Sequence, residues 1–490
     1  MIAGLSPEAT LIAALTAPLG GAVLIALTRK SVNLREAMTL VTATVTFALV
    51  ASLYPLVMAG GSPKVVLTEM LPGLELALVL EPLGMLFALI ASFLWIVTSI
   101  YAIGYMRGHH EKNQTRFYLF FAIAIAATLG VAFAGNMLTL FTFYEVLTLS
   151  TFPLVTHAGT PEAKRAGRIY LGILIGTSIG FQLVAVIWTW SLAGTLDFQA
   201  GGILEGKVSG TVAAILLVLY VYGIGKAALM PFHRWLPAAM VAPTPVSALL
   251  HAVAVVKAGV FSVLKVSYYI FGLDFLSTLP TAEGLQYMAA ATILIASLVA
   301  MTKDNLKARL AYSTISQLSY IVLGAMLANS LGFMGGGMHI AMHAFGKITL
   351  FFCAGSILVA SHKTNVSQMG GLGRTMPLTM FAFLIGSMSI IGLPPMGGMW
   401  SKWYLALGAL ESDQLFLVGV LMVSSLLNVA YLLPIPIRAF FGKAPGDTAT
   451  FGIKEAPLPM LIAISITMIG SVILFFYPDP VFDLIKQMVM

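Results

Sequence analysis

The sequence is poor in charge. Of its 490 residues, 26 are Lys or Arg and 19 are Asp or Glu, so only 9% are charged, whereas an ordinary soluble domain has about 25%. Hydrophobic residues make up 59% of the chain, and its mean hydropathy is +0.96. So few charges cannot coat a soluble fold of this length. The composition therefore excludes a cytoplasmic enzyme, a disordered protein and a nucleic-acid-binding protein.

Cysteine is almost absent as well. The single residue Cys353 excludes an intramolecular disulfide, a zinc site made of cysteines and an iron–sulfur cluster held by this chain alone. It lies in the apolar run ITLFFCAGSI, where we expect a small buried side chain. Neither a G-x-G-x-x-G nor a P-loop sequence is present, so nucleotide binding has no support. We expect no cofactor and leave a metal site open.

Long apolar runs are plentiful instead. A membrane-spanning helix needs about 20 apolar residues, and the chain has about fourteen such stretches. The first residues, MIAGLSPEAT, lack the basic region of a cleavable signal. We therefore predict an all-α integral membrane protein. The predicted spans are residues 9–27, 37–58, 81–105, 117–134, 137–157, 169–193, 211–241, 246–270, 285–301, 311–328, 336–360, 377–410, 415–439 and 457–477.

Basic residues favour every second loop between these spans. They are Arg29, Lys30, Arg35, Arg107, Lys112, Arg116, Lys164, Arg165, Arg168, Arg234, Lys303, Lys307, Arg309, Lys363, Arg374, Arg438, Lys443 and Lys454. The intervening loops and tails hold only Lys64, Lys207 and Lys486. Because short basic loops remain on the cytoplasmic side, we expect a multi-pass protein of a prokaryotic plasma membrane, with both termini on the non-cytoplasmic side.

A few ionisable residues lie inside the spans. They are Glu145, Lys226, Lys257, Lys265, Lys347 and Lys402. A charged side chain at the bilayer centre costs about 2.5–3.5 kcal/mol on insertion scales, so such residues must be paired, neutral or hydrated, and they mark candidate functional sites. Lys265 is nearer the outer end of its span and could extend its ammonium group to the surface. An anchoring role and a functional role are both open for it.

Two predicted spans, 211–241 and 377–410, are too long for one helix. The first reads VYGIGKAALMPFHRWLP around Lys226, and the second reads IIGLPPMGGMWSKWYL before Lys402. Proline and glycine at these positions predict broken helices, and a matching pair of broken spans is typical of inverted repeats. We divide the chain into three N-terminal spans (1–116), a five-helix repeat (117–270), an inverted five-helix repeat (285–441), and a last span with its tail (442–490).

Several segments resemble one family of membrane subunits. They are GNMLTLFTFYEVLTLS, KAALMPFHRWLPAAMVAPTPVSALLHAVAVVKAG, DNLKARLAYSTISQLSY, HAFGKITLFF and GLPPMGGMWSKW. They resemble the antiporter-like subunits of respiratory complex I, of membrane-bound hydrogenases and of Mrp-type multisubunit Na⁺/H⁺ antiporters. The length is most similar to that of the D-type Mrp subunits.

The resemblance implies a proton relay at mid-membrane depth. It implies that Glu145 pairs with Lys226. His339 lies near the same row of residues, but it matches the family less clearly than His343 does. The implied relay residues are Glu145, Lys226, Lys257, Lys347, Lys402, His251 and His343. It also implies a hetero-oligomeric membrane complex with other antiporter subunits, which carries protons and Na⁺.

Three alternatives are open at this point. The chain could be a proton-pumping subunit of a redox-driven complex, such as complex I or a membrane-bound hydrogenase. It could be a scaffold that anchors a peripheral enzyme, or a porter for an organic solute. The chain itself has no redox or hydrolytic site, so its membership of an enzyme is left open.

Overall fold

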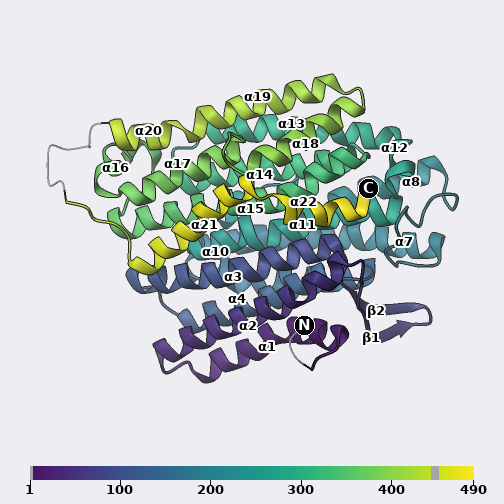
Figure 1. The fold of residues 1–490 in the computed structure, drawn as a ribbon, viewed down its shortest axis with the longest axis horizontal. Coiled ribbons are helices and arrows are strands. Elements are labelled where there is room, and N and C mark those ends of the chain that lie inside the picture. Colours follow the sequence, from purple (N-terminus) through teal and green to yellow (C-terminus); the bar gives the residue numbers. More distant parts are fainter. Residues whose placement is uncertain (1–3, 443–451, 490) are drawn as a thin grey trace.

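A computed structural model describes residues 4–442 and 452–489, so Lys443 lies outside the described residues. The described chain is a bundle of helices that run side by side along its longest axis (Figure 1). Helices α11, α14 and α15 lie in the middle, α1 and α2 along one side, and α19 along the opposite side. Cys353 is buried in α15, as expected.

The first half of the chain ends near residue 271. Its elements are α1 (Pro7–Leu27), α2 (Val32–Met58), β1 (Lys64–Leu71), β2 (Leu74–Val79), α3 (Pro82–Gly108), α4 (Gln114–Ala132), α5 (Met137–Val155), α6 (Pro161–Thr177), η1 (Ser178–Gln182), α7 (Leu183–Ala193), α8 (Gly210–Gly223), η2 (Gly225–Ala227), α9 (Trp235–Ala238), η3 (Ala239–Val241), α10 (Thr244–Ala248), η4 (Leu249–Val253), α11 (Val255–Lys265) and η5 (Val266–Phe271).

In the second half, every secondary-structure element among the described residues is a helix. Its elements are α12 (Leu273–Ser277), α13 (Pro280–Thr302), α14 (Leu306–Met326), α15 (Ser330–Ser361), η6 (Val366–Gln368), α16 (Leu372–Thr375), α17 (Pro377–Ile391), α18 (Gly398–Glu411), α19 (Leu415–Leu432), α20 (Pro434–Phe441), α21 (Leu458–Phe476) and α22 (Asp479–Val489).

The helices confirm the all-α membrane fold. Within the described residues, 11 helices are long and apolar enough to span a membrane, and α8 and α17 are shorter apolar helices. Both short helices begin a span that we predict to be broken. The predicted span 311–328 forms α14, which is buried along its length and carries polar residues such as Ser313 and Gln317. The exact number of spans stays a prediction.

The hairpin β1–β2 was not expected from the hydrophobic pattern. Its strands pair antiparallel from Lys64 opposite Val79 to Leu71 opposite Leu74. The hairpin is attached to the start of α5, because the amide of Ala77 donates to Thr139 Oγ1 (2.9 Å) and the amide of Gly135 donates to the Ala77 carbonyl (2.9 Å). The hairpin is therefore fixed to the beginning of α5 at one end of the bundle.

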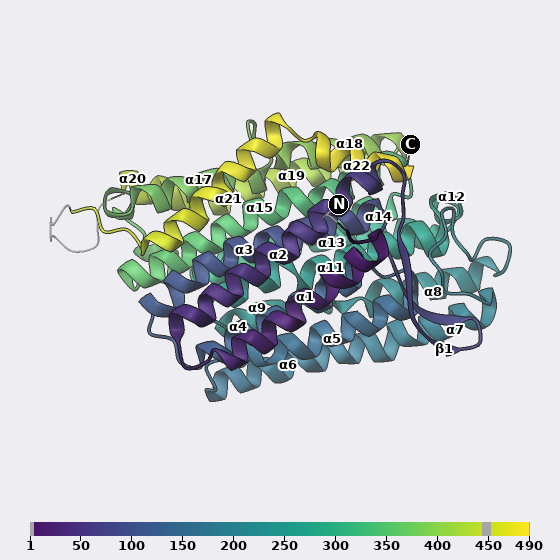
Figure 2. The ribbon, with the colours of Figure 1, turned by 60° about the horizontal axis from the view of Figure 1, so that its bottom comes forward.

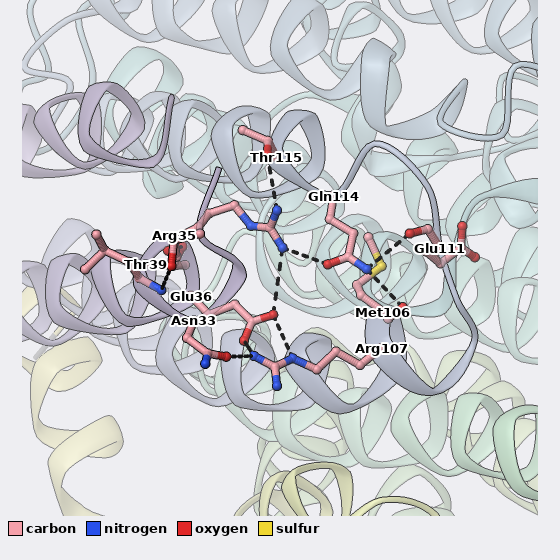
Figure 3. Close-up of polar contacts among 11 residues, drawn as sticks. Asn33, Arg35, Glu36, Thr39, Met106, Arg107, Glu111, Gln114 and Thr115 are labelled. Carbon is pink, nitrogen blue, oxygen red and sulfur yellow. Dashed lines mark hydrogen bonds and ion pairs between the residues drawn. The ribbon is translucent and has the colours of Figure 1, made fainter. Parts of the chain in front are cut away.

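At the opposite ends of the N-terminal helices, a cluster of polar side chains joins α2, α3 and α4 (Figure 3). Arg35 donates to Gln114 Oε1 (2.7 Å) and to Thr115 Oγ1 (3.2 Å). Arg107 forms an ion pair with Glu36, which is buried. Because these basic residues have acceptors within the chain, the cluster holds the three helices together.

The C-terminal helix α22 packs on the bundle instead of crossing it. Val481, Leu484 and Ile485 face inward, and Gln487 Nε2 donates to the Met58 carbonyl at the end of α2 (2.9 Å). The start of α1 and the C-terminal end of the chain lie toward the hairpin (Figure 2). Both ends of the described chain thus share one side of the bundle, while the cytoplasmic assignment stays a prediction.

Candidate functional site

The break predicted around Lys226 is confirmed. Helix α8 ends at Gly223, a single turn follows at Gly225–Ala227, and Ala228 has left-handed backbone (φ 55°). The carbonyl of Gly225 accepts from the amide of Ala228 (3.0 Å) and from the indole of Trp235 (3.0 Å). A side chain at position 225 has no room, because a Cβ atom would lie 2.2 Å from Thr177 Oγ1. The Lys226 amide donates to Tyr144 Oη on α5 (3.1 Å), so the opened backbone is bonded within the protein, as membrane depth requires.

Lys226 projects from this turn onto α5 and is fully buried. Its ammonium nitrogen donates to the Tyr144 carbonyl (2.9 Å) and to Thr148 Oγ1 (2.5 Å). The same nitrogen lies 3.1 Å from the centre of the Tyr144 ring, which is a favourable cation–π position. The lysine is thus held by dipoles and a π face.

The expected ion pair between Glu145 and Lys226 is not formed in this structure. No Lys226–carboxylate contact within 4 Å occurs among the described residues. Oε1 of Glu145 is buried and has no hydrogen-bond partner. The reason is local: the neighbouring residue Tyr144 offers its carbonyl and ring to the ammonium group, and successive helix residues point about 100° apart. Glu145 nevertheless lies on the turn of α5 that Lys226 contacts through Tyr144.

A glycine brings the next helix against this break. A Cβ atom at Gly259 on α11 would lie 2.4 Å from the amide nitrogen of Ala227. Only glycine permits so close an approach between two backbones. Lys257 is two residues earlier on α11, so its side chain leaves the helix about 200° away from the side that meets the Lys226 turn.

Lys257 contacts a histidine from the other half of the chain. Its ammonium nitrogen lies 2.6 Å from Nδ1 of His343 on α15. Both side chains are buried. Nε2 of His343 is also buried and has no partner. Nδ1 of His343 thus contacts Lys257, while Nε2 is free to form another hydrogen bond.

Helix α15 carries three of the polar residues on one face. His339, His343 and Lys347 follow one another at intervals of four residues, so they lie on one side of the helix. The rings of His339 and His343 are stacked with centroids 5.7 Å apart. Nδ1 of His339 contacts Ser401 Oγ (2.8 Å) on α18. The sequence ranked His339 below His343, whereas the structure includes both in one row.

Lys347 continues this row toward α14 and α19. Its ammonium nitrogen donates to Ser313 Oγ (2.7 Å). Tyr431 donates to Ser313 Oγ (2.9 Å) and lies 2.5 Å from Asn428 Oδ1. All of these side chains are buried. Lys347 therefore heads a chain of hydroxyl and amide groups.

The break predicted before Lys402 is also confirmed. Helix α17 ends at Ile391, Gly392 has left-handed backbone (φ 90°), and α18 begins at Gly398. Lys402 donates to the Ile391 carbonyl (2.9 Å) and to Ser425 Oγ (3.3 Å). A cation at this carbonyl also benefits from the negative end of the α17 dipole.

Lys402 also lines a cavity of about 560 Å³ between α18 and α19. The walls of the cavity are almost entirely apolar, and they include Trp403 and Leu426, which are 54% and 68% exposed. Of the four relay lysines, Lys402 is the one that is not fully buried.

His251 lies apart from the hydrogen-bonded row. It is buried on η4, its ring centroid is 4.8 Å from that of Phe351, and both of its ring nitrogens lack a partner. Because buried polar atoms are rarely left unpaired, the ring nitrogens of His251 and the free nitrogens of His339 and His343 are places where water would supply a hydrogen-bond partner.

The surface-anchoring role considered for Lys265 is wrong. Its side chain is 0% exposed and forms an ion pair with Glu81 Oε1 (2.6 Å). No role was expected for the hydroxyl groups that hold the lysines and histidines of the row. They belong to Thr148, Ser313, Ser401, Ser425 and Tyr431. Hydroxyl residues are common in helices, so no pattern singles these out.

The chain matches the profile of one protein family over residues 134–428, described as NADH:quinone oxidoreductase/Mrp antiporter, TM. It is 33% identical over 430 residues to NADH-quinone oxidoreductase subunit N of Desulforudis audaxviator, covering 85% of each chain. It is 28% identical to the D-type Na⁺/H⁺ antiporter subunit of Alkalihalophilus pseudofirmus, covering 83% of this chain and 82% of that one. It spans about half the length of the cyanobacterial NAD(P)H-quinone oxidoreductase chain 5 relatives that it also matches.

The fold is similar to a solved chain from the Mrp complex of Dietzia sp. DQ12-45-1b. The TM-score is 0.87 at 21% sequence identity, and the match covers 99% of this chain and 97% of that chain. At this identity the likeness shows the fold alone.

Proposed function

The chain belongs to the NADH:quinone oxidoreductase/Mrp antiporter family of membrane subunits, and we propose that it moves protons in a multisubunit Na⁺/H⁺ antiporter. The proton path runs at mid-membrane depth from the Glu145–Lys226 region through Lys257 and His343 to Lys402. His251 and Lys347 lie beside this path and serve it as further proton-holding groups.

The contact between Lys257 and His343 carries this proposal. The two nitrogens are 2.6 Å apart, and both groups are bases. A hydrogen bond between them requires a proton on one nitrogen and a lone pair on the other. The distance is within the range at which general acid–base groups exchange protons. The contact also links α11 with α15, so a proton that crosses it passes between the two proposed repeats.

Movement of Lys226 between two sets of partners would drive the transfer. In this structure its ammonium group is bound by Tyr144 and Thr148, while Glu145 is within the same turn and has an unpaired oxygen. A lysine–carboxylate contact at 4 Å is worth about 4 kcal/mol at an effective dielectric constant of about 20. That corresponds to about a thousandfold change in proton retention. Opening the pair releases the proton toward Lys257, and closing it restores the charge.

The second half of the path follows the row on α15. His343 stacks on His339, which contacts Ser401 one residue before Lys402. Lys347 provides a branch through Ser313 and Tyr431. Because Lys402 borders an open apolar cavity, the proton leaves the row next to a partner subunit of a hetero-oligomeric complex. We place that complex in a prokaryotic plasma membrane with both termini of this chain outside the cytoplasm.

A redox-driven proton pump is the second candidate. The observation that favours it is the 33% identity to a NADH-quinone oxidoreductase subunit N, against 28% for the D-type antiporter subunit. The proton path within this chain would be the same, and the energy source would be on another polypeptide.

Na⁺-dependent dissipation of a pH gradient tests the proposal. Everted membrane vesicles would be prepared from a strain without its own antiporters that expresses the complete gene cluster. Wild type would be compared with Glu145→Ala, Lys402→Ala and, as a matched control, Lys207→Ala, which alters an exposed lysine. We expect Na⁺ to alkalinise the vesicle lumen in wild type and the control, and to have no effect in the other two at equal expression.

Each other outcome has a defined meaning. A wild type that does not respond to Na⁺ would contradict the antiporter function and favour the redox-driven pump. A response that persists in Glu145→Ala and Lys402→Ala would leave the buried charges with a structural role, as a scaffold requires.

A further inference from the structure

A second charged site lies away from the proposed path, at the hairpin end of the bundle. Lys265 Nζ forms an ion pair with Glu81 Oε1 (2.6 Å), and Tyr269 donates to Glu81 Oε2 (2.5 Å). Glu81 also accepts from the amide of Gly84 at the start of α3 (3.1 Å). Both charged side chains are buried. The family resemblance gave neither residue a role.

The ion pair borders a cavity of about 280 Å³ under the hairpin. The lining residues are Ser62, Val79, Glu81, Ala134, Gly135, Phe198, Lys265 and Tyr269. The cavity has room for several water molecules, each of which occupies about 30 Å³ in the liquid. Ser62 is exposed, so the cavity reaches the surface on the hairpin side of the bundle. The pair therefore meets external water through Glu81, whose side chain is 10% exposed, while the Lys265 side chain behind it is 0% exposed.

Helix α11 connects this cavity to the proposed path. Lys265 follows Lys257 by eight residues on the same face, which is about 12 Å along the axis. Phe261 lies midway between them on that face. Its ring centroid is 5.5 Å from Lys265 Nζ and 5.0 Å from the ring centroid of Phe87. One aromatic side chain thus separates the two lysines along the helix.

We propose that the Glu81–Lys265 pair is the port through which protons pass between Lys257 and water on the hairpin side, an inference that rests on the proposed function. When cavity water moves past Glu81 to the Lys265 ammonium group, Lys265 gives it a proton, and that water becomes hydronium. The neutral amine then takes a proton from Lys257 through water that enters when Phe261 moves. Glu81 stays a carboxylate, held by Gly84 and Tyr269. One proton enters and one leaves, so the charge of the pair is restored.

A purely structural pair would only tie α3 to α11. Arginine separates the two roles, because it keeps the charge and the carboxylate contact but is not deprotonated in proteins. A structural pair tolerates Lys265→Arg. A proton port does not.

The decisive measurement is the Na⁺-dependent pH response of the complete complex in vesicles that carry Lys265→Arg, the neutral pair Glu81→Gln/Lys265→Gln, or the control Lys207→Arg. Lys207 is an exposed lysine whose ammonium donates to the Ala193 carbonyl (3.0 Å). We expect at least a tenfold lower rate in the first two variants and the wild-type rate in the control, with equal amounts of assembled complex. A wild-type rate in assembled Lys265→Arg or in the assembled neutral pair would overturn the port.

The neutral pair keeps the test valid if arginine prevents assembly, and the wild type separates the two proposals. Loss of the response in wild type contradicts the proposed function itself, whereas a normal wild type with unaffected variants contradicts only the port.

Water access has an independent test in Val79→Cys, with Leu78→Cys as the control and Cys353 replaced by Ala in both. Val79 borders the cavity, whereas Leu78 is fully buried and does not. We expect a charged methanethiosulfonate added from the hairpin side to label only Cys at position 79, and absence of labelling there would overturn the hydrated cavity.

Discussion

The two broken spans place a lysine in different surroundings. Lys226 is enclosed by α5, with the Tyr144 ring on one side and Thr148 on the other. Lys402 caps the end of α17 and borders an apolar cavity on the side of the bundle. The same device, a helix opened by glycine and proline, therefore produces one sealed site and one lateral site. The sealed lysine is enclosed by helices of its own chain, whereas the lateral one borders a side face of the bundle.

Arginine at each break should give the largest contrast. Lys226→Arg adds volume where no space exists, and overpacking a tight site costs about 1–3 kcal/mol, so we expect little assembled complex. Lys402→Arg can extend into the cavity, so we expect normal assembly without proton transport. Size-exclusion chromatography of a fluorescently tagged chain measures assembly, and the Na⁺-dependent pH response measures transport. Equal assembly of both variants would remove the distinction between a sealed and a lateral site.

Removing the hydroxyl partner of each lysine should give the next largest effect. Thr148→Val deletes a 2.5 Å contact to Lys226, and Ser425→Ala deletes a 3.3 Å contact to Lys402. A hydrogen bond to a charged group contributes about 1.5–3 kcal/mol, so we expect about a tenfold change in rate for Thr148→Val. The longer contact at Ser425 should matter less. Initial rates in vesicles at equal expression give the ratio, and the reverse order would mean that Lys402 is the more tightly held group.

The exposed wall beside Lys402 should affect assembly moderately. A charged group facing hydrocarbon is unfavourable, so we expect a partner subunit to cover this cavity. Trp403→Ala should then lower the recovery of partner subunits with this chain. Ile187→Ala, which alters a residue 57% exposed on α7, is the matched control and should have no effect. Equal recovery in affinity purification would show that lipid alone covers the cavity.

The smallest effect concerns pH and the end of α5. Burial lowers the pKa of His157, and the nearby Glu111 carboxylate opposes this only in part. A histidine that stays neutral when folded stabilises the protein above its unfolded pKa of about 6.5 and loses this contribution as the pH falls below it. We expect the melting temperature of the complex to fall between pH 7.5 and pH 5.5, and to fall less in His157→Gln. His362, at the end of α15, is exposed, so His362→Gln should leave the pH dependence unchanged.

The architecture could be predicted because membrane depth constrains the chain strongly. Runs of about 20 apolar residues define spans, and glycine with proline around Lys226 and Lys402 marked both breaks. The partners of those lysines could not be predicted. The family resemblance points to Glu145 as the partner of Lys226, but the direction of each side chain depends on the rotation of the helix about its axis. That rotation presents the carbonyl and ring of Tyr144 to Lys226.

Contacts between distant segments explain the other differences. The position of Lys265 near the end of its predicted span suggests a surface anchor. In the fold, Glu81 at the start of α3 binds its ammonium group inside the bundle. The hairpin could not be predicted from the sequence. Pro72 and Gly73 indicate a turn, but the hydrogen bonds that fix the hairpin join it to Gly135 and Thr139, which are distant in the sequence. His339 ranked low because only the fold brings Ser401 to its ring.

The hairpin also offers a handle for topology experiments. Its turn, Pro72 and Gly73, is exposed, and Gly73 has left-handed backbone (φ 77°). Exposed turns tolerate inserted sequence better than packed segments do. A protease site or a short epitope inserted there would report which face of the membrane the hairpin occupies, without altering any helix that carries a buried lysine.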